Sequence, residues 1–148
     1  MDCELCNCCE EDIVTAVSYP LITIGMSCFN AQETILAAVE SALTQDYPNI
    51  RIIIVDDCST DESVDIIKKL AQQDKRITLI LHDKNQGIAT VHNTIIENAT
   101  SEFLAIFDDD DISQPDRLSK QYNRIVDYER EFSTDMVLCH SARIQNFD

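Results

Sequence analysis

Short apolar runs recur along the chain, and each is bounded by polar residues. Runs of this kind are typical of strands that are covered on both faces, as in a parallel sheet between two layers of helices. The predicted strands are residues 21–26, 50–55, 77–81, 103–107 and 136–139.

Amphipathic segments lie between the runs. Apolar residues recur in them three and four positions apart, which is the spacing of a helix with one buried face. The predicted helices fall within residues 35–43, 64–71, 88–99 and 118–126. Ser59 and Glu62 have the spacing of a capping box and predict the start of the second helix. Strand–helix alternation of this kind predicts an α/β fold with a doubly wound, mainly parallel sheet.

Acidic side chains follow several of the predicted strands. Because parallel strands point the same way, the residues after them share one edge of the sheet, where open α/β sheets bind ligands. That edge carries residues 27–30, 56–57, 82–83 and 108–111, and acids occur in three of these four segments. Acidic clusters that converge on one crevice indicate a site.

Four consecutive aspartates occupy residues 108–111, directly after an apolar run. Adjacent carboxylates repel one another unless a cation joins them, and Mg²⁺ or Mn²⁺ can bridge carboxylates to the phosphates of a substrate. The alternative is a solvated acidic loop before the next helix, because Ser113, Pro115 and Asp116 follow and acids favour a helix N-terminus. The run alone leaves both interpretations open.

The chain of 148 residues carries a formal net charge of -16. This charge argues against nucleic acid and anionic membrane surfaces as partners, since both require basic patches. No stretch approaches the roughly 20 apolar residues of a membrane span, and the N-terminus is acidic where a secretory signal would be basic. We therefore expect a cytoplasmic protein without a membrane span, and its oligomeric state is left open.

Four of the seven cysteines, Cys3, Cys6, Cys8 and Cys9, lie close to the N-terminus. Cys3 and Cys6 form a C-x-x-C pair, but no second pair follows at the spacing of a zinc ribbon. We interpret residues 1–18 as a disordered, cysteine-rich acidic tail, with zinc binding or redox chemistry as the alternative. The odd cysteine count without a disulfide framework favours a reducing compartment.

Glycine is scarce, since only Gly25 and Gly87 occur and they lie far apart. Dinucleotide-binding Rossmann domains need a G-x-G-x-x-G turn, and the phosphate loops of NTPases need G-x-x-x-x-G-K-[ST]. Both designs are excluded. A diphosphate would have to be held by a cation rather than by a nest of backbone amides.

Four segments carry a resemblance to a known family. They read P-L-I-T-I-G-M-S-C-F-N (residues 20–30), Q-D-Y-P-N-I-R-I-I-I-V-D-D-C-S-T-D (45–61), N-Q-G-I-A-T-V-H-N (85–93) and F-D-D-D-D-I-S-Q-P-D-R-L (107–118). In this order and register they resemble the nucleotide-sugar-binding half of family 2 glycosyltransferases. The resemblance implies a Rossmann-like GT-A domain over residues 19–148.

The resemblance also implies roles for individual residues. Asp57 would accept a hydrogen bond from the nucleotide base, and Ser27 and Phe29 would line the base pocket. Within the acidic run, Asp108 and Asp110 resemble the two acids of a D-x-D motif. Asp110 would bind Mn²⁺ or Mg²⁺ directly, while Asp108 or Asp109 would contact the ribose or the waters of the metal.

The function implied by the resemblance is that of a metal-dependent, inverting glycosyltransferase. It would transfer a sugar from a nucleotide sugar, in particular a UDP-sugar, to a glycan or lipid-linked acceptor, in the cytoplasm or peripherally at the inner membrane face. Relatives continue with an acceptor-binding part that supplies the general base. We therefore expect a chain truncated before that part, with the base beyond Asp148.

Two other functions remain open. A non-catalytic nucleotide-binding or scaffold module of the same fold would keep the site residues without transferring sugar. A receiver-type signalling domain also gathers acids around Mg²⁺ at strand ends. It needs a lysine at a later strand end, however, and Lys84 is poorly placed for that role.

Overall fold

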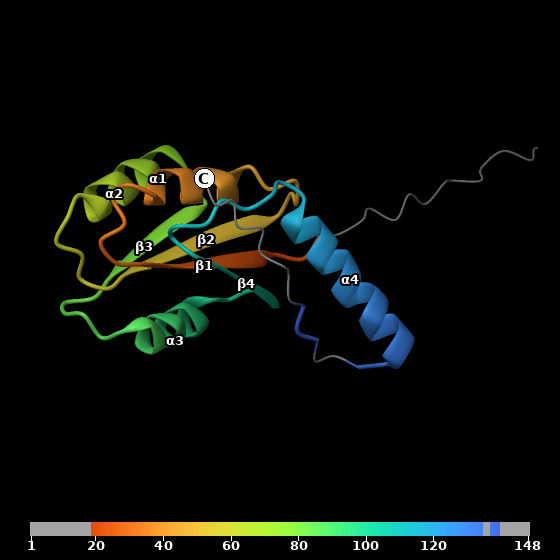
Figure 1. Ribbon diagram of the computed structural model, residues 1–148. Coiled ribbons are helices and arrows are strands. Elements are labelled where there is room, and N and C mark those ends of the chain that lie inside the picture. The colour runs from red at the N-terminus through yellow and green to blue at the C-terminus, as the bar shows by residue number, and fades with distance from the viewer. Residues whose placement is uncertain (1–18, 135–136, 140–148) are drawn as a thin grey trace, which may run out of the picture.

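The computed structural model describes residues 19–134 and 137–139 and contains one sheet flanked by helices (Figure 1). In chain order the elements are β1 (Ile22–Cys28), α1 (Ile35–Leu43), β2 (Ile50–Asp56), α2 (Ser63–Gln73), β3 (Ile77–Leu81), α3 (Ile88–Asn98), β4 (Phe103–Phe107) and α4 (Arg117–Phe132). Each element corresponds to a predicted run or amphipathic segment. No helix in the described part of the chain has the length and apolar character that crossing a bilayer requires.

The strands lie in the order β3-β2-β1-β4, and every pairing is parallel. From β1 the chain adds β2 and β3 on one side and then returns to place β4 on the other side of β1. The strand order therefore reverses between β1 and β4. Open α/β sheets bind ligands at the carboxyl ends of the strands that flank such a reversal. The predicted doubly wound sheet is confirmed.

This order excludes the receiver-type alternative. A flavodoxin-like receiver fold places its first strand between its second and its third. Here β1 lies between β2 and β4, and β3 lies beyond β2. The acids that follow β4 are consequently brought beside the end of β1.

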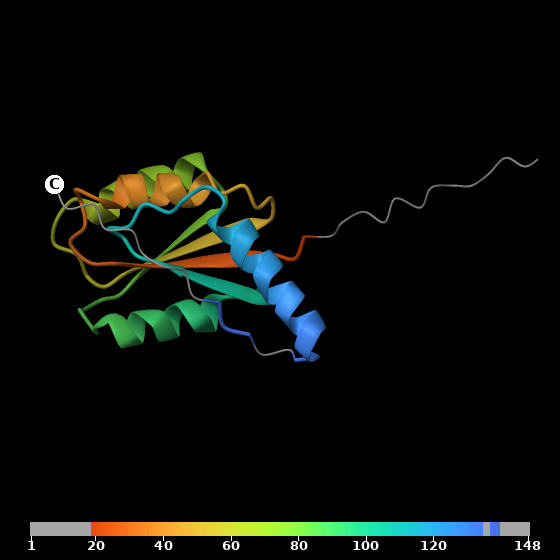
Figure 2. The ribbon, with the colours of Figure 1, turned by 45° about the vertical axis from the view of Figure 1, so that its right-hand side comes forward.

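α1 and α2 cover one face of the sheet and α3 covers the other, as two views show (Figure 1 and Figure 2). The core divides in the same way, because alternate side chains of a strand point to opposite faces. Ile52 and Ile54 belong to the core under α1 and α2, whereas Ile53 and Val55 pack against α3. Both faces of the inner strands are thus apolar, which explains the apolar runs in the sequence.

Gly25 in β1 lets α3 lie close to the sheet. A Cβ atom at this position would overlap with the side chain of Ile95 in α3 and touch that of Ile106 in β4. Ile95 is fully buried and belongs to the core on the α3 face. The glycine is therefore required by packing.

The predicted fifth strand is wrong in its described part. Residues 137–139 pair with no strand, and Leu138 is 92% exposed. A strand needs a neighbour that completes its backbone hydrogen bonds, and no described segment supplies one here. Met136 and residues 1–18, the predicted cysteine-rich tail, lie outside the described residues.

The predicted capping box is also wrong. α2 begins at Ser63, and Glu62 makes no side-chain hydrogen bond that caps the helix. The hydroxyl and the backbone N–H of Ser59 donate instead to the carboxylate of Asp56. Asp61 serves the helix start, where its carboxylate accepts from the backbone N–H of Ser63 at 3.0 Å.

Candidate functional site

A pocket of about 360 Å³ opens at the carboxyl edge of the sheet. Its walls come from the end of β1, the residue after β2, the β3–α3 loop with the first turn of α3, and the loop after β4. Four of the residues predicted for the site line it, namely Ser27, Phe29, Asp57 and Asp109. Asp108 and Asp110 do not line it, and both are exposed on the loop that carries Asp109.

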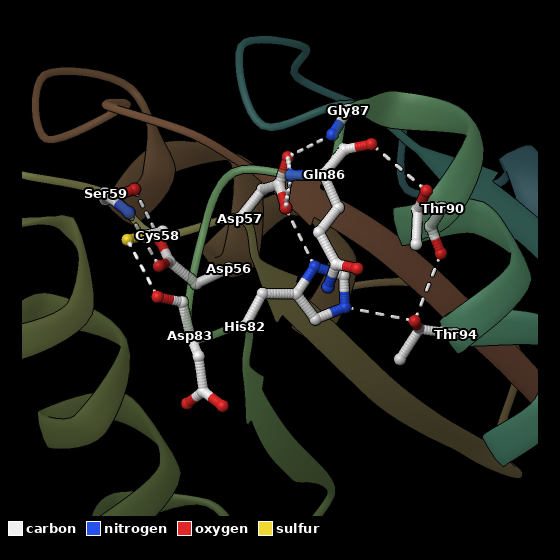
Figure 3. Close-up of polar contacts among 10 residues, drawn as sticks. All are labelled: Asp56, Asp57, Cys58, Ser59, His82, Asp83, Gln86, Gly87, Thr90 and Thr94. Carbon is white, nitrogen blue, oxygen red and sulfur yellow. Dashed lines mark hydrogen bonds and ion pairs between the residues drawn. The ribbon is translucent and has the colours of Figure 1, made fainter.

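Asp57 is buried at the pocket, with its side chain 5% exposed. Three N–H groups donate to its carboxylate (Figure 3). They are the backbone N–H of Gly87 at 2.7 Å, the backbone N–H of Gln86 at 2.9 and 3.1 Å from the two oxygens, and Nδ1 of His82 at 2.8 Å. Asp57 therefore ties the end of β2 to the β3–α3 loop.

Hydrogen bonds keep Asp57 ionised despite its burial. Burial alone would raise the pKa of this carboxyl, but the hydrogen bonds from His82, Gln86 and Gly87 outweigh burial and hold the pKa below its ordinary value of 3.8. An ionised carboxylate only accepts hydrogen bonds. The proton of the short contact therefore lies on Nδ1 of His82.

Three N–H donors share the two carboxylate oxygens of Asp57. Oδ1 accepts from His82 and Gln86, and Oδ2 accepts from Gly87 and, at 3.1 Å, from the same N–H of Gln86. An ionised carboxylate offers about four lone-pair positions. Because the side chain of Asp57 lines the pocket, a ligand with an N–H group aimed at it could take the place of the longer branch of the Gln86 bond.

Asp109 lines the pocket from the loop after β4. Its Oδ2 accepts a hydrogen bond from the backbone N–H of Phe29 at 3.2 Å. Burial raises the pKa of the Asp109 carboxyl, and the charges of Asp110 and Asp108 raise it further, while the N–H of Phe29 opposes them. A cation beside this loop would lower the pKa again, since it favours the ionised form.

Apolar side chains complete the pocket. Phe29 is 48% exposed and Ile88 is 57% exposed, and both line the cavity together with the buried Val91 of α3. Apolar walls with a few polar groups suit a flat ligand with polar edges, because the walls cover its faces and the polar groups fix its orientation.

Side-chain hydrogen bonds join the loops that follow β1 and β2. The backbone N–H of Asn30 donates to the hydroxyl of Ser59 at 2.9 Å, and Oδ1 of Asn30 accepts from the backbone N–H of Thr60 at 2.8 Å. Each loop contains a non-glycine residue at positive φ, Asn30 at 52° and Cys58 at 66°. Such backbone conformations persist where the surroundings hold them, so these loops have fixed positions beside the pocket.

Comparison with known proteins decides the family. Residues 23–145 match the family model for glycosyl transferase family 2. The chain belongs to that family.

Several curated relatives of this family 2 chain are similar over most of its length. An uncharacterized glycosyltransferase of Haemophilus influenzae is 38% identical and covers 72% of the chain and 43% of its own length. The UDP-Glc:alpha-D-GlcNAc-diphosphoundecaprenol beta-1,3-glucosyltransferase WfaP of Escherichia coli is 41% identical, with coverage of 68% and 39%. The chain therefore spans less than half of the length of these relatives.

Solved structures agree with the family assignment. Mannosyltransferase PcManGT from Pyrobaculum calidifontis, in complex with GDP-Man and Mn²⁺, has a TM-score of 0.67 at 25% identity and covers 72% of this chain and 32% of its own. TarS of S. aureus has a TM-score of 0.66 at 23% identity, with coverage of 74% and 33%. The family 2 chain thus has the fold of GT-A glycosyltransferases.

The acidic loop, residues 108–111, is the part of this family 2 chain that could hold a metal. No group of three or more His, Cys, Asp or Glu side chains among the described residues is placed to bind a metal ion. The loop offers carboxylate oxygens only, and Asp108 and Asp110 are exposed. Mg²⁺ and Mn²⁺ accept such ligands and complete their shells with water and substrate phosphates. The residues fit a metal that binds together with a diphosphate.

Arg117 anchors the acidic loop, although the sequence pattern indicated no role for it. Its guanidinium donates to the backbone oxygen of Ile106 and to the hydroxyl of Ser113, each at 2.9 Å, and lies 4.1 Å from the ring centroid of Phe107. The acidic loop lies between these anchor points. One signal in the sequence could have indicated this role: Arg117 is the first basic residue after the four aspartates.

Proposed function

We propose that this chain forms the donor-binding part of a metal-dependent, inverting glycosyltransferase that takes its sugar from a nucleotide sugar. The observation that carries the proposal is the pocket, which brings Asp57 and Asp109 together at the reversal of the strand order. Its volume of about 360 Å³ suits a small organic ligand, and open α/β sheets bind nucleotides at this position.

In this proposal Asp57 reads the nucleotide base, and Ser27 and Phe29 line the base pocket. In the orientation that we propose, Asp57 accepts from a ring N–H of the base, which uracil and guanine have. Cytosine and adenine lack it and carry their N–H groups on an exocyclic amino group at another position of the base. Two similar proteins agree with this requirement, since the name of WfaP specifies UDP-Glc and PcManGT was solved with GDP-Man. We favour a UDP-sugar, because WfaP is 41% identical to this chain and PcManGT 25%.

The proposed metal is Mn²⁺ or Mg²⁺, bound by Asp110, with Asp108 or Asp109 at the ribose or at metal-bound water. A bound cation neutralises the diphosphate and stabilises it as a leaving group. Two features support this role: Arg117 holds the residues on either side of the acidic loop, and the backbone N–H of Phe29 holds the carboxylate of Asp109. The Mn²⁺ in PcManGT supports a divalent metal.

We propose a glycan or a lipid-linked saccharide as the acceptor, since the name of WfaP specifies a substrate linked to diphosphoundecaprenol. A lipid-linked acceptor would bring the protein to the inner membrane face. In an inverting displacement a general base takes the proton of the acceptor hydroxyl on the side opposite the leaving diphosphate. We assign no described residue to that role, because Asp57 and the acidic loop serve the base and the diphosphate.

Isothermal titration calorimetry with UDP, GDP, CDP and ADP, each in Mn²⁺ and in EDTA, tests this proposal. We expect UDP to bind most tightly and UDP affinity to fall in EDTA. CDP and ADP should bind about tenfold more weakly, because they lack the ring N–H and their amino groups reach Asp57 only if the base shifts. Equal UDP affinity in Mn²⁺ and EDTA would contradict the metal role. Equal affinity for all four nucleotides would contradict the role of Asp57, and no binding at all would reject donor binding.

A further inference from the structure

His82 connects Asp57 to helix α3. It follows β3, its side chain is 8% exposed, and its Nδ1 donates to Asp57 at 2.8 Å. On the other side of the ring, Nε2 lies 3.0 Å from the hydroxyl oxygen of Thr94 in α3 (Figure 3). One buried imidazole therefore uses both nitrogens, and each contacts a different element.

His82 differs from the other donors to Asp57 because it is fixed to the sheet. Its backbone N–H donates to the carbonyl of Asp56 at 2.9 Å. Gln86 and Gly87 instead belong to the exposed β3–α3 loop, where Gly87 has a φ of 83° that only glycine adopts readily. The orientation of the Asp57 carboxylate relative to the sheet is therefore set by His82.

Thr94 holds the second side of the imidazole ring. Its hydroxyl oxygen lies 3.0 Å from Nε2 of His82 and 3.1 Å from the carbonyl oxygen of Thr90. A hydroxyl has one proton and two lone pairs, so it can serve the ring either as donor or as acceptor. Thr94 therefore holds the ring whether it donates to Nε2 or accepts from it.

We propose that His82 is a positioning residue for donor recognition, which fixes the Asp57 carboxylate in the orientation that accepts the N–H of the nucleotide base. This inference rests on the proposed function. The rotation of a carboxylate about its last side-chain bond is loosely restrained by itself. Without His82 the carboxylate would keep only its two loop donors, and the loop could move with it.

Three variants separate the two contacts of the ring. His82→Leu removes both. His82→Asn keeps an amide N–H near the position of Nδ1 and so retains the donor to Asp57, whereas His82→Gln places its amide near Nε2 and retains only the contact with Thr94. If His82 acts through Asp57, the Asn variant rescues nucleotide binding and the Gln variant does not.

Calorimetry in Mn²⁺ with UDP and with inorganic pyrophosphate measures the effect. We expect His82→Leu to weaken UDP binding about tenfold, the loss expected for one hydrogen bond to a charged group. Pyrophosphate affinity should stay unchanged, because it lacks the base. The preference for UDP over CDP should shrink in the Leu and Gln variants and persist in the Asn variant.

Ile67→Val is the matched control for stability, since Ile67 is fully buried in α2 on the opposite face of the sheet. It should lower the melting temperature without changing UDP affinity. UDP binding by His82→Leu at the wild-type level would overturn the inference, and so would a parallel loss of UDP and pyrophosphate affinity. Failure of the wild-type chain to bind UDP or GDP would reject the proposed function as well.

Hydrogen exchange gives a test that needs no nucleotide. The backbone N–H groups of Gln86 and Gly87 are held by Asp57, so they should exchange faster in His82→Leu than in Ile67→Val. Equal exchange at these two amides in both variants would overturn the inference, whatever nucleotide the wild-type chain binds.

Discussion

At Asp57 the fold keeps a carboxylate charged where burial favours the neutral acid. Donors from His82, Gln86 and Gly87 replace the lost water. The pocket thereby contains an ionised acceptor that is oriented before a ligand arrives, which lowers the cost of recognition. The same contacts join β2, β3 and α3, so stability and recognition depend on one side chain.

Asp57→Asn should destabilise the fold at neutral pH and have little effect in acid. Because the pKa of Asp57 is lower in the folded state, its ionisation stabilises the fold above the unfolded pKa of 3.8. This contribution is lost as the pH falls through the folded value. We expect a loss of about 1–3 kcal/mol at pH 7. Urea unfolding at pH 7 and pH 3 measures both values, and equal losses would contradict the assignment.

Asp110→Asn should remove most of the Mn²⁺-dependent part of UDP affinity and spare the affinity measured in EDTA, because the cation loses its proposed direct ligand. Asp57→Ala should lower UDP affinity and leave metal binding largely intact. Asp127→Asn is the matched control, since Asp127 is an exposed acid near the far end of α4. Calorimetry in both buffers compares the three variants. Unchanged Mn²⁺ dependence in Asp110→Asn would move the metal to another acid.

The sequence could indicate the acids of the site but not their donors. Asp57 and the acidic loop are visible because carboxylates follow apolar runs. His82 lies 25 positions from Asp57, and its role depends on where β3 lies beside β2 and on the rotamer of its ring. Such hydrogen bonds can be predicted only when the positions of the strands are known.

At the level of elements, the spacing of apolar residues was sufficient to predict those helices and strands that are held by burial. The helices and the four strands of the described sheet follow apolar spacing, and their positions were predicted. The capping box was not, because Ser59 has a closer acceptor in Asp56 that belongs to the preceding strand. The predicted strand at 136–139 shows that an apolar run alone does not supply a pairing partner.

Gly25→Ala should destabilise the fold by about 1–3 kcal/mol, the usual cost of overpacking a core. The added Cβ would overlap with Ile95, so α3 would have to move away from β1. Chemical denaturation measures the loss. In the Gly25→Ala background, Ile95→Ala should cost less than it does alone, because the truncated side chain relieves the overlap.

Gly87→Ala is the control for the loss of a glycine without a packing clash. Nothing lies within 4 Å of the position of its Cβ, and its φ is 83°. Its ψ is 160°, and this backbone region is essentially restricted to glycine, so the variant should lose about 1–3 kcal/mol through backbone strain alone. Ile95→Ala should not relieve that loss. Additive losses in the Gly25 pair would show that α3 does not approach β1 through this contact.

For the whole molecule, the order of strands decides which acids meet. Alternation of strands and helices predicts a doubly wound sheet, and the resemblance to family 2 glycosyltransferases places the site at its carboxyl edge. The order β3-β2-β1-β4 then brings the loop after β4 beside the end of β1, where Asp109 contacts Phe29. Spacing in the sequence cannot show this neighbourhood, because it arises only when the chain returns across the sheet.

The two cores on either side of the sheet differ in size. Among the described residues, the core on the α3 face has four buried members, and the core under α1 and α2 has seventeen. Local opening needs less free energy where fewer apolar contacts must separate. We expect amides of α3 to exchange with solvent faster than those of α1 and α2, and UDP with Mn²⁺ to slow exchange in α3 most.

Comparable exchange in all three helices would show that the faces open together. If α3 opens first, the wall of the pocket that carries Ile88 and Val91 can loosen while the sheet and its other layer stay folded. The local opening of α3 would then limit how fast a nucleotide enters and leaves the pocket. Mutations in α3 that do not contact the ligand would change the rate of donor exchange.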